Sequence, residues 1–169
     1  MKFSVLVVFF MFIGVNLLVA QLKLPSVDIY TLNGTRVDAN IICNDSVPMI
    51  LVFFKTYDND CRKNLSSINE AYENFLHERN IKVVAICVDG IGKINHVKPF
   101  VLGNDLDMEV YIDKNGNLKR MMGISDVPYT IIYDHNMAVY CQYNGYCTGI
   151  EEMICNKVME CINNILVKK

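Results

Sequence analysis

An unbroken apolar run from Met49 to Phe54 is the feature that most constrains the fold of this chain. A continuous run of this length, without alternation of polar residues, is typical of a strand buried on both faces in a parallel sheet. Asp58 follows closely as a good helix N-cap, and apolar residues then recur at helical spacing up to about Arg79. The segment therefore predicts one strand-to-helix unit of a sheet that other layers cover.

Strand and helix patterns continue to alternate beyond this unit. Residues 81–88 repeat the buried-strand pattern, and a weaker helix pattern follows over residues 94–103. The other predicted elements are a hairpin within residues 24–47 around Asn33-Gly34, a strand over 108–112, a helical turn over 117–122, antiparallel strands over 129–133 and 137–143, and a C-terminal helix from Ile150. This order predicts an α/β fold whose central mixed β-sheet is flanked by helices and preceded by an N-terminal β-hairpin.

The N-terminus has the pattern of an export signal. Met1-Lys2 gives a minimal basic start, residues 3–18 are almost wholly apolar, and Ala20 is the kind of small residue after which signal peptidases cut. We therefore expect residues 1–20 to be a signal peptide and residues 21–169 to form a single domain of an exported protein, periplasmic or secreted. The alternative is an uncleaved membrane anchor facing outside the cytoplasm, because the apolar run is near the ~18 residues that a spanning helix needs.

Charge and histidine content exclude two classes of function. The 16 Lys and Arg against 18 Asp and Glu give a net charge of -2, without a basic cluster of the kind that binds phosphate backbones. The three histidines are scattered, and no Cys-x-x-Cys pair occurs. We therefore expect no nucleic-acid partner and no metal site.

The seven cysteines indicate an oxidising compartment for an exported chain. Their odd number leaves at least one thiol free or paired between chains. Cys141 and Cys147 bracket a turn at the end of a strand, and these two or Cys155 are candidates for a structural disulfide. Cys161 lies on the apolar stripe of the C-terminal helix and is expected in the core.

The order of elements, together with several motifs, resembles the TlpA-like, or ResA-like, branch of the thioredoxin superfamily. The motifs are Leu51-Val-Phe-Phe leading to Cys61-Arg-Lys, the Asp113-Lys-Asn-Gly turn, Val127-Pro128-Tyr-Thr-Ile-Ile-Tyr-Asp, and Asn144-Gly-Tyr before an acidic helix start. The resemblance covers roughly residues 24–166. It implies a thioredoxin-like domain and an exported thiol-disulfide oxidoreductase that acts on the cysteines of other proteins, with no cofactor.

Position 58 departs from that family. The resemblance implies a Cys-x-x-Cys pair whose first cysteine is the attacking thiolate, but Asp58 stands at this position and only Cys61 remains. A carboxylate cannot form a mixed disulfide, so the two-thiol cycle is closed to residues 58 and 61. Asp58 and Asp60 should oppose ionisation of Cys61, and the basic residues Lys55, Arg62 and Lys63 should compensate in part. We expect Cys61 to be a poor nucleophile. Its structural role would be that of a small apolar residue buried in the core.

The resemblance also points to residues around this turn. It implies that Pro128 forms a cis peptide bond and that Val127, Pro128 and Tyr57 shape a groove that holds an extended substrate segment. A strand-initiating proline is the alternative for Pro128. Cys87, near the carboxyl end of the neighbouring strand, is the one candidate to replace the missing thiol, and a core-facing cysteine is its alternative. Asp89 loosely matches an acidic residue that some relatives use as a proton acceptor, or else it simply ends the strand.

Two functions from different classes follow. The first is thiol chemistry through Cys61 alone or with a distant cysteine, with protein thiols as partners. The second is a non-catalytic module that binds extended protein segments beside Pro128. A third, thiol peroxidase activity, requires a cysteine near the start of the helix with a threonine before it; Thr56 is present, but residue 59 is Asn59.

Overall fold

The computed structural model describes residues 24–166. The predicted signal peptide, residues 1–20, lies outside the described residues. No helix within residues 24–166 has both the length and the apolar character needed to cross a membrane.

A seven-stranded mixed sheet forms the centre of the domain, in the order β2-β1-β5-β4-β3-β6-β7. Its strands are β1 (Asp28–Thr31), β2 (Arg36–Asp38), β3 (Met49–Phe54), β4 (Lys82–Cys87), β5 (Glu109–Ile112), β6 (Tyr129–Tyr133) and β7 (Val139–Asn144). The pairs β3–β4 and β4–β5 are parallel, and the remaining pairs are antiparallel. The sequence prediction of a mixed sheet with buried central strands is confirmed.

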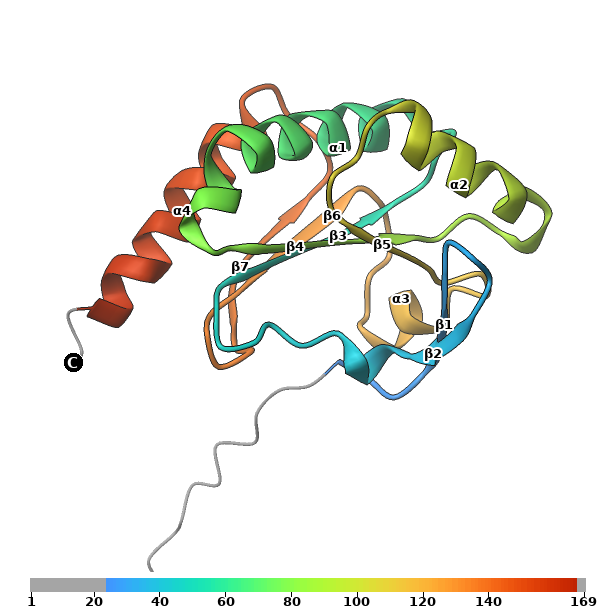
Figure 1. The fold of residues 1–169 in the computed structure, drawn as a ribbon, viewed down its shortest axis with the longest axis horizontal. Helices are drawn as coiled ribbons and strands as arrows, with labels where there is room; N and C mark the ends of the chain where they lie inside the picture. The colour runs from blue at the N-terminus through green and yellow to red at the C-terminus, as the bar shows by residue number, and fades with distance from the viewer. Residues whose placement is uncertain (1–23, 167–169) are drawn as a thin grey trace, which may run out of the picture.

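The helices cover the two faces of the sheet unequally (Figure 1). The α-helices are α1 (Asn59–Ala71), α2 (Ile94–Gly103), α3 (Asn117–Met121) and α4 (Ile150–Leu166). Helices α1, α2 and α4 pack on one face, where buried residues of each join one hydrophobic cluster. The short α3 and the 3-10 turn η1 (Ala39–Ile41) contribute to a second cluster on the opposite face. Single-turn segments η2 (Tyr72–Leu76) and η3 (His77–Arg79) extend α1, and η4 (Ile91–Lys93) precedes α2.

The two hairpins differ from expectation in small ways. Asn33-Gly34 forms the predicted turn, with Gly34 at a φ of 82°, a value that glycine adopts without strain. The β1–β2 hairpin is not separate from the main fold, because β1 also pairs with β5 and so extends the sheet. β7 begins two residues later than predicted, because Met137 has a positive φ and still belongs to the turn.

Candidate functional site at the start of helix α1

Asp58 caps α1 as the sequence predicts. Its backbone is extended (φ -93°, ψ 128°), and its side chain accepts a hydrogen bond of 2.8 Å from the backbone N–H of Cys61. This hydrogen bond holds the pKa of the Asp58 carboxyl below its usual value of 3.8. The carboxylate therefore occupies, as an anion, the backbone donors that would stabilise a thiolate at this position.

Cys61 is fully buried in the first turn of α1. The pKa of its thiol is raised to about 12, chiefly by burial; a hydrogen bond with the Lys55 backbone and the charge of Lys55 lower the pKa, and the hydrogen bond and charge of the Asp58 carboxylate raise it. The raised pKa agrees in direction with the prediction of a poor nucleophile. The main cause differs from the one that sequence reasoning gave, because removal from water outweighs the nearby negative charges.

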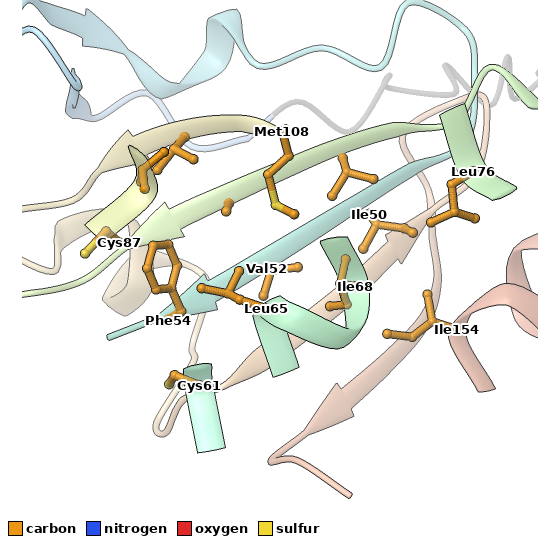
Figure 2. Packing of buried hydrophobic residues seen from close by; sticks show 14 of the residues in the cluster. Ile50, Val52, Phe54, Cys61, Leu65, Ile68, Leu76, Cys87, Met108 and Ile154 are labelled. Carbon is orange, nitrogen blue, oxygen red and sulfur yellow. The ribbon is translucent and has the colours of Figure 1, made fainter. Parts of the chain in front are cut away.

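Cys87 lies in the same hydrophobic cluster as Cys61 (Figure 2). Both sulfurs are at one end of the cluster, and in this view the Phe54 ring separates them. Burial raises the pKa of Cys87 far above its usual range; a hydrogen bond with the Asp89 backbone opposes this rise, whereas the Asp89 carboxylate and Cys61 add to it. The structure therefore brings the two thiols into one region but keeps both neutral and free.

Asp89 is fully buried. A residue that only ended the strand in a turn would not need to be buried. The Asp89 carboxylate accepts hydrogen bonds from the Thr56 backbone N–H at 3.1 Å and from the Thr56 hydroxyl at 2.5 Å. These bonds join the loop after β4 to the loop after β3. Thr56 is therefore a partner of Asp89, a pairing that the sequence did not reveal because the two residues are 33 positions apart.

Pro128 lies beside the strand-to-helix turn, because β6 pairs with β3 and Tyr129 stands opposite Phe53. The Val127–Pro128 peptide bond is cis, as the resemblance implies, and Pro128 itself is buried. Val127 is half-buried and contacts both hydrophobic clusters. The predicted site residues of this region thus come together at one end of the sheet.

Tyr57 is the exposed member of the group, with 52% of its surface accessible. The Lys93 ammonium lies 3.2 Å from the centroid of the Tyr57 ring. The ammonium of Lys55, the residue after β3, lies 5.9 Å from the same centroid. Ile91, in the same 3-10 turn as Lys93, is 68% exposed. Sequence reasoning missed Lys93 and Ile91, since an isolated basic and an isolated apolar residue in a loop carry no recognisable signal.

Asn64 is another residue that the sequence did not place at the site. It is fully buried one turn after Cys61, and its amide donates a hydrogen bond of 3.3 Å to the Thr130 hydroxyl, two residues beyond Pro128. Its side-chain oxygen has no hydrogen-bond partner in the described part of the chain. Asn64 therefore links α1 to β6.

The predicted disulfide among Cys141, Cys147 and Cys155 is wrong, because all seven cysteines are free thiols. Cys141 and Cys155 pack against the hydrophobic cluster. Cys147 instead lies exposed in the loop after β7, with its Sγ 3.9 Å from the Met153 Sδ. Cys161 is buried, as predicted.

Metal ligands do not gather at the site or elsewhere in the described chain. Among residues 24–166, no three side chains of His, Cys, Asp or Glu are arranged to hold a metal ion.

A mixed sheet in which a buried strand leads into a capped helix with a cysteine in its first turn, beside a cis-proline, defines a protein of the thioredoxin-like fold. Residues 20–148 match the AhpC/TSA family, and the chain belongs to that family.

Relatives agree with this assignment. The chain is 26% identical over 121 residues to the thiol-disulfide oxidoreductase ResA of Bacillus thuringiensis, an alignment that covers 72% of this chain and 67% of ResA. A thioredoxin-like protein from Porphyromonas gingivalis has 33% identity and a TM-score of 0.72, with 83% of this chain and 92% of that one covered. A secreted disulfide oxidoreductase from Mycobacterium tuberculosis shares the fold, with 14% identity, a TM-score of 0.65, and 80% and 96% of the two chains covered.

Proposed function

We propose that this protein binds extended segments of other proteins beside Tyr57, Val127 and Pro128, and that it does not exchange disulfides through positions 58 and 61. The observation that carries the proposal is the Asp58 carboxylate, which caps α1 at the position where the family resemblance implies the attacking thiol. Asp58 cannot form a mixed disulfide. Cys61, neutral and buried, offers no replacement at neutral pH.

The exposed surface beside the cap supports a binding role. Tyr57 and Ile91 present apolar area at the same end of the sheet as Pro128, with Lys55 and Lys93 around the tyrosine ring. An exposed tyrosine is a frequent anchor in protein recognition because it offers a large contact area at a low cost in side-chain entropy. The segment that fits best is apolar with an acidic residue near Tyr57, where the two lysines lie.

Single-thiol and peroxidase chemistry receive less support from the same geometry. A thiol exchange at Cys61 or Cys87 would first have to expose a buried sulfur to solvent. A peroxidase would need its cysteine at position 59, where Asn59 is the first residue of α1, and the Thr56 hydroxyl is already bonded to Asp89.

We place the binding function outside the cytoplasm. The apolar segment before Ala20 supports export by a cleaved signal peptide. The thiol-disulfide oxidoreductase relatives make protein thiols, or the segments around them, the natural class of partner. N-terminal sequencing of the protein recovered from its host tests this location, with a mature chain that starts at residue 21 as the expected result.

Binding is tested with alkylated insulin B chain, an extended polypeptide without reactive thiols, by fluorescence anisotropy. We expect Tyr57→Ser to weaken binding at least fivefold and Cys61→Ala to leave it unchanged. Ile41→Ser is the matched control, because Ile41 is 50% exposed and lies in η1, among the elements on the opposite face of the sheet. Equal effects of Tyr57→Ser and Ile41→Ser would count against the proposed surface.

The second arm of the experiment measures insulin reduction with dithiothreitol as the electron source. Wild type should show no activity, and Asp58→Cys should gain it, because a cysteine at the helix cap receives the amides that lower a thiol pKa. Asp58→Ser is the control without a thiol. Wild-type reduction that disappears in Cys61→Ser would overturn the non-catalytic assignment.

A further inference from the structure

A cavity of about 780 Å³ lies between the β1 hairpin and α2, and its lining does not include Tyr57, Val127 or Pro128. Residues 30–34 of the hairpin form one side, α2 forms the other, and Ile112 and Lys114 from the end of β5 complete it. In Figure 1 the blue hairpin and α2 lie at the same side of the molecule. The volume of the cavity is within the range of roughly 300–1,000 Å³ that is typical of small-molecule sites.

Most of the exposed wall of the cavity is apolar. The apolar lining residues are Tyr30, Leu32, Ile94, Pro99, Leu102 and Ile112. Ile112 belongs to the buried cluster, whereas Leu102 is 65% exposed at the opening. A large apolar side chain at this exposure is stabilised when a ligand covers it. The cavity therefore favours an elongated aliphatic group.

Two lysines supply the only charges among the residues that line the cavity. The Lys98 Nζ donates a hydrogen bond of 2.8 Å to the Asn33 side-chain oxygen, and the Lys114 Nζ lies 3.7 Å from the centroid of the Tyr30 ring. Both partners are neutral, and neither lysine joins an ion pair within the described residues. Two ammonium groups without counter-ions beside an apolar wall favour an anionic head group.

We propose that this cavity binds a monomeric alkyl carboxylate, with the carboxylate at Lys98 and Lys114 and the alkyl chain along Leu102 and Ile112. The site is independent of the segment-binding surface at Tyr57. A carboxylate can accept hydrogen bonds from both ammonium groups. The alkyl chain gains from removal of its surface, and that of Leu102, from water.

Isothermal titration of the purified protein with octanoate, decanoate and dodecanoate, each below its micelle concentration, tests the proposal. We expect one site per chain and an affinity that rises about threefold to fourfold for each added CH₂. Decylammonium, which has the same chain but the opposite charge, should bind at least tenfold more weakly than decanoate. Equal binding of the two decyl ions would contradict the assigned head group.

Substitutions at two exposed residues, Lys98 and Leu102, locate the binding site and should not destabilise the fold. Lys98→Gln should weaken decanoate binding at least threefold, whereas Lys157→Gln, on α4, should not change it. Leu102→Ser should weaken binding to a similar extent, and Met121→Ser, at a residue 61% exposed on α3, serves as its control. Loss of affinity in the control variants, or none in Lys98→Gln and Leu102→Ser, would show that the carboxylate binds elsewhere.

Discussion

Asp58 caps the start of α1, and we propose that it also removes the thiol chemistry that a cysteine at this position would support. The cap could be predicted from the sequence, because the preference for Asp at a helix start is local and depends on backbone donors within three residues. The burial of Cys61 could be anticipated only as one alternative, since it depends on the assembly of a hydrophobic cluster whose members come from many parts of the sequence.

Replacement of Asp58 by asparagine tests the charge of the cap. The folded-state pKa of Asp58 is below the ordinary 3.8, so the ionised carboxylate stabilises the fold above that pH, and this stabilisation is lost as the pH falls through the lowered pKa. Near neutral pH we expect Asp58→Asn to be less stable than wild type by about 0.5 kcal/mol, while its amide oxygen still caps the helix. Urea unfolding at about pH 7 and about pH 2.5 measures this, and a difference that does not shrink at low pH would contradict it.

At the scale of elements, the strands and helices with a clear hydrophobic period could be predicted. The predicted bounds of β3 and β6 agree with the structure, because continuous apolar runs and turn residues mark both ends. Contacts between loops distant in the sequence could not be predicted. The bond between Thr56 and Asp89 and the pairing of β1 with β5 arise only when the sheet assembles.

The Thr56–Asp89 contact joins two loops at the carboxyl ends of adjacent parallel strands. Thr56→Val removes the hydroxyl donor and leaves part of a buried carboxylate without a partner, so we expect a loss of about 1–3 kcal/mol in the free energy of unfolding. Thr56→Ser keeps the donor and should lose far less. Chemical denaturation compares the two variants, and an equal loss in both would mean that the methyl group, and not the hydroxyl, stabilises the loops.

For the whole molecule, family motifs and element order were sufficient for the thioredoxin-like fold, whereas the cysteine pairing and the cavity were not. Spacing allowed a disulfide at Cys141, Cys147 or Cys155, but pairing depends on distances and directions that spacing does not contain. The cavity between β1 and α2 likewise has no sequence motif. Its lining comes from three separate stretches of the chain.

We predict that the segment from Asp58 to Cys61, which holds one thiol and not two, does no thiol exchange in the folded protein. Incubation with glutathione disulfide at about pH 7, followed by acid quenching and peptide mass spectrometry, measures this directly at each cysteine. The exposed Cys43 and Cys147 should acquire glutathione, and Cys61 should remain a free thiol until urea unfolds the chain. Glutathione on Cys61 of the folded protein at a rate comparable to that of Cys43 would contradict the claim.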